Sequence, residues 1–216
     1  MEKIISLDPC NFSLALTKAA KVLENGGLIA LPTDTIYGVS SLLEHFEKIY
    51  NLKQRPKEKP LGLFVGDASM VKKYSKQTIS DSLLNELLPG PVTLVFERSP
   101  ALPSFFNPSV SNIGIRIPEH PFVQELCRKF PDQPLAQTSA NISGAVSPLC
   151  IEDFEDLWNS LDFIIDGGQI VGSCLGSTVV DLSKEGEYQI IRDGSARDQT
   201  ISILEMHGLT ASKWIS

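Results

Sequence analysis

Short apolar runs alternate with amphipathic segments along most of the chain. The runs have the length and composition of buried strands and lie at 28–31, 61–65, 92–96, 114–117, 135–138, 163–165, 178–182 and 188–191. Segments with helical periodicity lie between several of them, at 14–23, 41–52, 67–75, 80–88, 121–130, 151–158 and 198–206. This interleaving predicts a mixed α/β fold.

The last two predicted strands are separated only by the short polar segment 184–187. That spacing is typical of an antiparallel hairpin. The earlier strands alternate with helices, which is typical of a sheet with parallel pairs. The sequence therefore predicts an open sheet of mixed direction, flanked by helices.

The composition of the 216 residues, 42% hydrophobic and 21% charged, is that of an ordinary soluble protein, and we expect one compact domain. No run of about 18 apolar residues occurs, and the first residues resemble neither a signal peptide nor a transit peptide. We therefore expect a cytoplasmic protein without a membrane segment. The four cysteines and three histidines are dispersed, which predicts free thiols and no protein-bound metal.

Four cations are crowded between a predicted helix and a predicted strand: Lys53, Arg55, Lys57 and Lys59. The block 53–59 has a net charge of +3, so the rest of the chain carries −10 of the total of −7. A basic cluster on an acidic background favours a localised anion, such as a nucleotide or polyphosphate, over diffuse attraction to nucleic acid. The alternative is a solvated loop, although the prolines at 56 and 60 favour a stiff, extended backbone.

Three polar loops follow predicted strands. Residues 32–38 read Pro-Thr-Asp-Thr-Ile-Tyr-Gly, and strand ends are where α/β sheets commonly bind ligands. The alternative is a turn in which Thr33 and Asp34 only satisfy local amides. Residues 137–144 carry the hydroxyl and amide groups that orient a polar small molecule. Residues 167–178 are glycine-rich but match no nucleotide-binding fingerprint.

Two arginines are embedded in apolar sequence. Arg116 lies between two isoleucines, and Arg192 follows two more. An arginine that faces the core must find an anion, whereas strand alternation could turn either residue outward. The pattern leaves both alternatives open.

In these motifs the chain resembles the YrdC-type threonylcarbamoyl-adenylate synthases from about residue 8 to about residue 195. The resemblance rests on residues 32–38, Lys53, Arg55-Pro56, Lys59-Pro60-Leu61, 88–93 (Leu-Pro-Gly-Pro-Val-Thr), 114–118 (Gly-Ile-Arg-Ile-Pro), Ser139, Asn141, Ser143-Gly144 and 176–181 (Gly-Ser-Thr-Val-Val-Asp). Residues 83–95 and 154–158 are most similar to the animal members of that family.

The resemblance implies a YrdC-like catalytic domain at 8–195, with an open twisted mixed sheet and a central positively charged cleft, and a C-terminal helix and tail at 196–216. It also implies an enzyme that condenses L-threonine, bicarbonate and ATP, with Mg²⁺, into threonylcarbamoyl-adenylate and pyrophosphate. The product would pass to a downstream tRNA threonylcarbamoyl transferase complex that makes N6-threonylcarbamoyladenosine (t6A). No covalent protein nucleophile is needed, because threonylcarbamate itself attacks ATP.

The resemblance further assigns roles to single residues. Catalytic roles fall to Lys53, Arg55, Ser139 and Asn141. Nucleotide binding falls to Lys53, Arg55, Lys59, Asn141, Ser147 and Arg192. Threonine binding falls to Thr33, Thr35, Arg116, Ser139 and Ser177. The chain departs from the common family pattern at Gln54, Lys59, Phe64 and Asp193, and the last departure bears on the geometry around Arg192.

Two alternatives to the synthase remain. One is an RNA-binding module without synthase activity, which the net charge of −7 and pI of about 5.0 disfavour, although a local cleft could still bind RNA weakly. The other is a carbamoyl-transfer module of the kind fused to hydrogenase-maturation proteins, but those modules occur within longer chains. A mitochondrial form from another start site is compatible with the resemblance.

Overall fold

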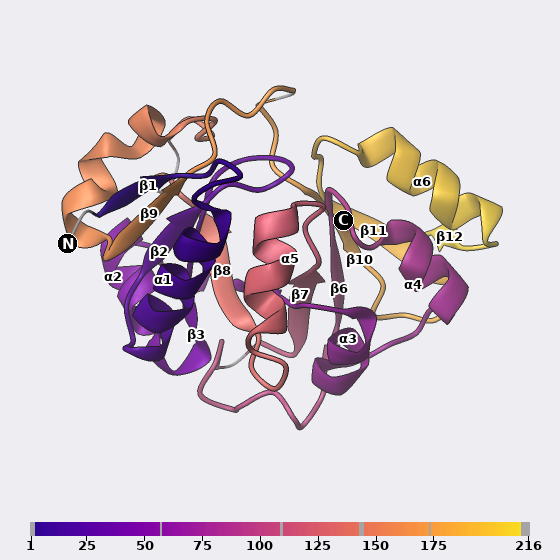
Figure 1. Ribbon diagram of the computed structural model, residues 1–216. Coiled ribbons are helices and arrows are strands. Elements are labelled where there is room, and N and C mark those ends of the chain that lie inside the picture. Colours follow the sequence, from indigo (N-terminus) through magenta and orange to yellow (C-terminus); the bar gives the residue numbers. More distant parts are fainter. Residues whose placement is uncertain (1–2, 57, 109, 143–144, 173, 213–216) are drawn as a thin grey trace.

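The computed structural model describes residues 3–56, 58–108, 110–142, 145–172 and 174–212 (Figure 1). The helices are α1 (Phe12–Glu24), α2 (Glu47–Lys53), α3 (Ala68–Tyr74), α4 (Asp81–Leu87), α5 (Pro121–Arg128) and α6 (Arg197–Met206), with 3-10 helices η1 (Leu43–His45) and η2 (Ile151–Ser160). The strands are β1 (Ile4–Ser6), β2 (Ile29–Leu31), β3 (Gly38–Leu42), β4 (Gly62–Phe64), β5 (Ser75–Lys76), β6 (Val92–Arg98), β7 (Asn112–Arg116), β8 (Leu135–Ser139), β9 (Phe163–Asp166), β10 (Thr178–Asp181), β11 (Glu187–Arg192) and β12 (Thr210–Ala211).

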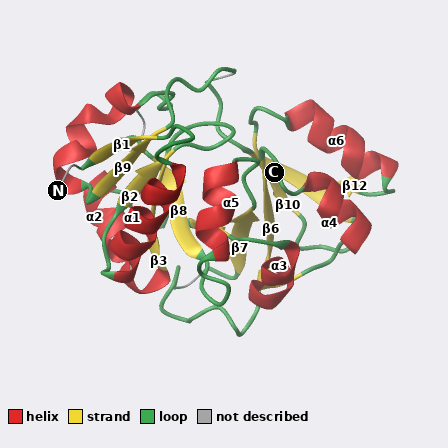
Figure 2. Ribbon diagram, in the orientation of Figure 1, coloured by secondary structure: helices red, strands yellow, loops and turns green. Residues whose placement is uncertain are grey.

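One twisted sheet holds all twelve of these strands, in the order β1-β9-β2-β3-β8-β4-β7-β6-β10-β11-β12, with β5 paired to β6. Its directions are mixed, since β4 runs parallel to β7 whereas β8 runs antiparallel to both β3 and β4. The helices lie around the outside of the sheet (Figure 2). The predicted mixed α/β sheet flanked by helices is confirmed, and so is the antiparallel hairpin of β10 and β11.

All eight predicted strands are present, but the predicted helix at 41–52 is wrong at its start. Strand β3 occupies Gly38–Leu42, and the helical conformation begins at Leu43. Every residue of β3 is buried, including Ser40 and Ser41, so the strand lacks the alternation of polar and apolar residues that would reveal it. Strands β1, β5 and β12 were not predicted either, and none of them lies in one of the apolar runs.

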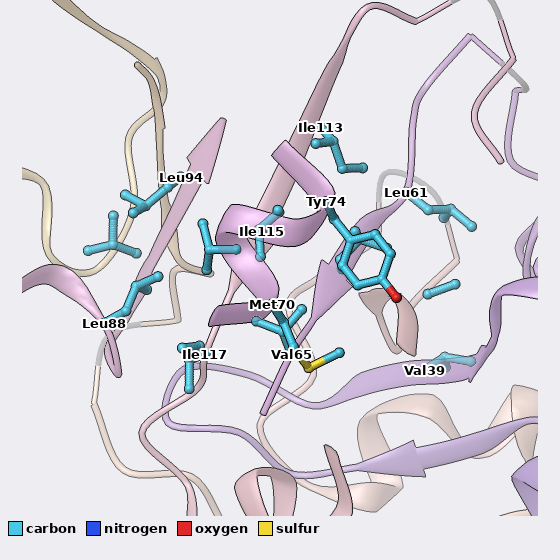
Figure 3. Packing of buried hydrophobic residues seen from close by; sticks show 14 of the residues in the cluster. Val39, Leu61, Val65, Met70, Tyr74, Leu88, Leu94, Ile113, Ile115 and Ile117 are labelled. Atoms are coloured by element: carbon cyan, nitrogen blue, oxygen red, sulfur yellow. The ribbon is translucent and has the colours of Figure 1, made fainter. Parts of the chain in front are cut away.

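Two apolar clusters form the core, on opposite faces of the sheet. Strand β2 shows the division, because Ala30 packs into one cluster and Ile29 and Leu31 into the other, as the strand period of two requires. Helices α1 and α5 pack against each other. In the larger cluster, Met70 and Tyr74 of α3 lie over the sheet beside residues such as Val65 (Figure 3).

The C-terminal part of the described chain also packs on the domain. Helix α6 contacts α4, and its Leu204 is fully buried in the larger cluster. Strand β12 pairs in parallel with β11. Among the described residues, no helix is both long enough and apolar enough to cross a bilayer.

Gly194 lies where the chain leaves β11 and approaches the start of β10. A Cβ atom on this residue would be 2.2 Å from the Thr178 backbone nitrogen and 2.3 Å from the Ser177 carbonyl carbon. These neighbours are backbone atoms, so they cannot rotate away. The close approach therefore requires glycine.

We predict that Gly194→Ala lowers the free energy of unfolding by about 1–3 kcal/mol, because the added methyl group overpacks the start of β10. Urea unfolding followed by circular dichroism measures the change. Ser195→Ala, a substitution at the exposed neighbouring residue, serves as the control. An unchanged unfolding midpoint for Gly194→Ala would show that the two segments can separate without cost.

Candidate active site

A cleft of about 390 Å³ opens along the middle of the sheet. Its walls come from the turn between β2 and β3 and from β4, β6, β7, β8, β10 and β11. Pockets of about 300–1,000 Å³ are typical of small-molecule sites. The cleft brings together seven of the residues assigned to the site by resemblance: Thr33, Thr35, Arg55, Arg116, Ser139, Ser177 and Arg192.

Arg116, the last residue of β7, supplies a buried positive charge to the cleft. Its Nε donates to the Gly90 carbonyl at 3.0 Å, its Nη1 donates to Thr35 Oγ1 at 3.0 Å, and its Nη2 donates to the Asp34 carboxylate. Burial lowers the pKa of Arg116 to about 10, against the opposing effect of Asp34, so the guanidinium stays charged at neutral pH. Of the two alternatives for this arginine, the inward-facing one is correct.

The turn before β3 is held by one hydroxyl. Thr33 Oγ1 accepts hydrogen bonds from the backbone N–H of Thr35 at 3.0 Å and of Ile36 at 3.2 Å, and donates to the Ile36 carbonyl at 2.7 Å. Thr33 thus acts as the local turn residue of the alternative interpretation, although it also lines the cleft. Asp34 does not cap the turn in this way, because its carboxylate pairs with Arg116.

Ser177 lies opposite this turn, just before β10. Its Oγ is 2.8 Å from Thr93 Oγ1, and its carbonyl accepts from Arg192 Nη2 at 2.7 Å. Arg192 also donates to Ser177 Oγ at 3.1 Å. The Arg192 side chain is exposed at the rim, where partial burial and the charge of Arg55 both lower its pKa.

The basic cluster 53–59 does not act as one unit. Arg55 lines the cleft, where its Nε donates to the Lys59 carbonyl at 2.9 Å and its Nη2 donates to the Pro60 carbonyl at 3.0 Å. The side chain of Lys59 is exposed, and Lys57 lies outside the described residues. The cluster therefore gives one guanidinium to the cleft wall, one surface cation and one buried ammonium.

That buried ammonium belongs to Lys53, the last residue of α2, which is only 1% exposed. Its Nζ donates to the Ser139 carbonyl and lies 3.3 Å from both Ser139 Oγ and Asn141 Oδ1. Burial lowers the pKa of Lys53 to about 7, and the charge of Arg55 makes a smaller contribution in the same direction. Lys53 therefore lies behind Ser139, and Ser139 itself forms the cleft surface.

Asn141 continues this arrangement into the next loop. Its Oδ1 accepts from Ser139 Oγ at 2.6 Å, and its Nδ2 donates to the Ala145 carbonyl at 2.7 Å. Ser147 is half-buried further along this loop, and neither it nor Asn141 lines the cleft. The motif residues Ser143 and Gly144 lie outside the described part of the chain.

Four other cleft residues had no individual role assigned from the sequence, although Thr93, Gln137 and Asp181 lie in motifs that the sequence singled out. Thr93, Asn112, Gln137 and Asp181 all line the cleft. Each lies on a predicted strand or at its edge, and inward-facing polar residues on strands are the signal that could have found them. Asp34 was considered as part of a ligand-binding turn or as a local cap, and nothing in the sequence pairs it with Arg116.

The start of the glycine-rich loop is tied to the same region. The Tyr37 hydroxyl donates to the Gly168 carbonyl at 2.8 Å and accepts from the Gly167 N–H at 2.9 Å. All four cysteines are free. Within the described ranges no group of three or more His, Cys, Asp or Glu side chains has the arrangement of a metal site.

Comparisons with known proteins agree with this geometry. The family model Sua5/YciO/YrdC, described as "Telomere recombination", matches residues 21–194. The human protein named "Threonylcarbamoyl-AMP synthase" is 45% identical over 207 residues, covering 92% of this chain and 74% of that protein. The Bos taurus protein of the same name is 46% identical over 206 residues, with the same coverage.

A solved structure is similar over nearly the whole chain. The crystal structure of P. abyssi Sua5 complexed with L-threonine superposes with a TM-score of 0.79 at 25% identity, covering 97% of this chain and 62% of that one. Sequence, motifs and three-dimensional structure thus lead to the same group of proteins. This chain belongs to the Sua5/YciO/YrdC family.

Proposed function

We propose that this chain is a threonylcarbamoyl-AMP synthase, an enzyme that makes threonylcarbamoyl-adenylate from L-threonine, bicarbonate and ATP. The names of the human and bovine relatives support this reaction, and the L-threonine complex of P. abyssi Sua5 supports the amino-acid substrate. The observation that carries the proposal for this molecule is the buried, partly unsatisfied guanidinium of Arg116 in a cleft that also holds Arg55.

The reaction requires positive charge near the phosphates of ATP. A carbamate oxygen of threonylcarbamate attacks the α-phosphorus of ATP, the bond to the pyrophosphate oxygen breaks, and pyrophosphate leaves with the electron pair. Negative charge therefore develops on phosphate oxygens, and fixed cations stabilise it without having to reorganise. Catalysis by this chain is then mainly a matter of positioning and charge.

Arg116 is the residue that would bind the threonine carboxylate. Its guanidinium still has N–H groups without a partner among the described residues, and a planar fork of N–H groups fits a carboxylate. Thr35, Ser177 and Ser139 supply nearby hydroxyl groups for the ammonium and hydroxyl of threonine. Thr33 supports this end of the cleft through the turn that it holds.

Arg55, Lys59 and Arg192 would bind the ATP phosphates. Asn141 and Ser147 lie in the segment after Ser139 and would complete the nucleotide site. Lys53 would act from behind Ser139, which it holds through hydrogen bonds from its Nζ. Mg²⁺ would enter with ATP, and Asp181 on the cleft wall would help to hold it. A single protein carboxylate is enough for a Mg²⁺ ion that is bound mainly through its substrate.

The adenylate would then be consumed by a tRNA threonylcarbamoyl transferase complex in the cytoplasm or in mitochondria. Weak contact with RNA fits this sequence of reactions, but the net charge of −7 gives it little electrostatic support. The chain's own chemistry ends with the adenylate and pyrophosphate.

We expect the purified protein to release pyrophosphate only when ATP, Mg²⁺, bicarbonate and L-threonine are all present, because the attacking group must first form from threonine and bicarbonate. Mass spectrometry should detect threonylcarbamoyl-adenylate. Serine in place of threonine is the control for the side chain. Pyrophosphate release that does not depend on threonine or bicarbonate would contradict the proposal, and a folded protein that binds RNA but not ATP would favour the RNA-binding alternative.

We predict that Arg116→Lys raises the KM for L-threonine by about 10–100-fold, the loss expected when one charge-assisted hydrogen bond of about 1.5–3 kcal/mol is removed. The KM for ATP should change less, because ATP binds at the other cations. Steady-state kinetics with each substrate varied separately measures both values. Arg128→Lys, which changes an exposed arginine on α5, is the matched control. An equal rise in the KM values for both substrates would show that Arg116 does not bind threonine specifically.

The lowered pKa of Lys53 has a consequence for stability. In the folded state this pKa is about 7, well below its ordinary value, so between these two values the unfolded chain binds the extra proton. Stability should therefore rise with pH through this window, by at most about 1.4 kcal/mol per pH unit. Urea unfolding of the wild type and of Lys53→Met at about pH 6.5, 8.0 and 9.5 isolates the effect. A difference between the two proteins that does not vary with pH would mean that the ammonium keeps its ordinary pKa.

A further inference from the structure

Asn107 has an unusual backbone and an almost fully buried side chain. Its φ is 45°, in the left-handed region that asparagine tolerates better than most residues, and it is 3% exposed. It lies in the connection between β6 and β7, far along the chain from the cluster 53–59. A buried amide in this conformation needs partners for both its donor and its acceptor.

The amide finds both partners on one residue. Asn107 Oδ1 accepts from the Leu61 N–H at 3.1 Å, and its Nδ2 donates to the Leu61 carbonyl at 2.8 Å. Leu61 precedes β4, and the ladders of β4 with its neighbours begin only at Gly62. The side chain therefore pairs with Leu61 as a neighbouring strand would, and fixes the backbone at the entrance to β4.

The connection itself is held by an arginine. Arg98 Nη1 donates to the Phe106 carbonyl at 2.8 Å and to the Asn107 carbonyl at 3.1 Å, and its Nη2 donates to the Pro103 carbonyl at 2.7 Å. Five N–H···O contacts from one guanidinium leave this segment little freedom. Asn107 is thus a fixed support against which Leu61 is placed.

From Leu61 the hydrogen bonds lead to the cleft. The Tyr50 hydroxyl lies 3.1 Å from the Lys59 carbonyl and 3.3 Å from Asn107 Oδ1, and donates its one hydrogen to either. The carbonyls of Lys59 and Pro60 in turn accept the Nε and Nη2 hydrogens of Arg55. The segment 59–61 is therefore held from behind by Asn107 and Tyr50, and holds Arg55 in front.

We propose that Asn107 is a positioning residue for the nucleotide end of the cleft: through the backbone of residues 59–61 it sets the orientation of the Arg55 guanidinium that binds the ATP phosphates. Tyr50 assists through its hydroxyl. This inference rests on the proposed function in taking the phosphates of ATP as the ligand of Arg55. Asn107 does not line the cleft and touches no substrate, so its effect should be specific to the ligand that Arg55 binds.

The test compares the affinities of the full chain for MgATP and for L-threonine, measured by calorimetry. Asn107→Gly removes the amide but keeps a residue that adopts positive φ without strain. We expect it to weaken MgATP binding by about five- to tenfold, the effect of losing one or two buried hydrogen bonds, and to leave threonine affinity within about twofold. Tyr50→Phe keeps the ring and should weaken MgATP binding by about two- to fivefold.

Two further measurements separate positioning from a general loss of structure. Tyr188→Phe removes a hydroxyl that binds Glu205, away from the cleft, and should leave both affinities unchanged. In an Arg55→Lys background, the effect of Asn107→Gly on MgATP should fall below about twofold, because the fork that Asn107 orients is already gone. Each variant's thermal unfolding is followed in parallel.

The outcomes are distinct from those of the synthase assay. MgATP affinity within twofold of the wild type in folded Asn107→Gly, or an equal loss of both ligands, overturns the inference even if the protein makes the adenylate. A selective loss of MgATP affinity upholds it even if no adenylate forms. If Asn107→Gly does not fold, Tyr50→Phe decides: unchanged MgATP affinity overturns the inference, and selective weakening upholds it.

Discussion

A positive charge held inside the sheet is the constraint on which the cleft depends. Removing a guanidinium from water is costly, so Arg116 can be buried only where oxygen atoms surround it. Gly90 supplies a carbonyl, Thr35 a hydroxyl and Asp34 a carboxylate, and these come from two loops that are distant in the sequence. The turn that carries Asp34 and Thr35 is in turn folded around the hydroxyl of Thr33. The charge thus fixes the geometry of the floor of the cleft.

The order of strands in the sheet brings the remaining parts to this charge. Strand β3 pairs with β8, so that Gly38 lies opposite Ser139 and the turn before β3 reaches the end of β8. Strand β10 pairs with β6, which brings Ser177 to the hydroxyl of Thr93. The antiparallel pair sets the start of β3 beside the end of β8, and the parallel pair sets the starts of β6 and β10 side by side. The mixed directions are therefore part of what forms the site.

The cations around the cleft also act on one another. Burial is the largest cause of the lowered pKa of Lys53, Arg192 and Arg116. The charge of Arg55 lowers the pKa of the first two further, and the charge of Arg192 does the same to Arg116, where Asp34 opposes it. Such mutual repulsion raises the free energy of the ligand-free protein and is relieved when an anion binds between the charges. A triphosphate and a carboxylate together would offset it.

Sequence by itself determined the elements and the chemistry of this protein. Apolar runs such as 92–96 must be buried, and their spacing gave the mixed α/β sheet and the hairpin of β10 and β11. The motifs around Arg55 and Arg116 indicated an anion site, because charged groups at strand ends need counter-charges. Strand β3 escaped prediction, since its buried serines carry no period that separates strand from helix.

Only the tertiary structure decided which of these residues meet. The two arginines that follow apolar residues look alike in sequence. In the structure, Arg116 is buried against Asp34, whereas Arg192 lies at the rim of the cleft. Neighbouring cations were also separated, because the end of α2 turns Lys53 inward behind Ser139 while Lys59 stays in solvent. Burial and pairing depend on contacts between distant segments, and the strand order that creates those contacts is a property of the whole sheet.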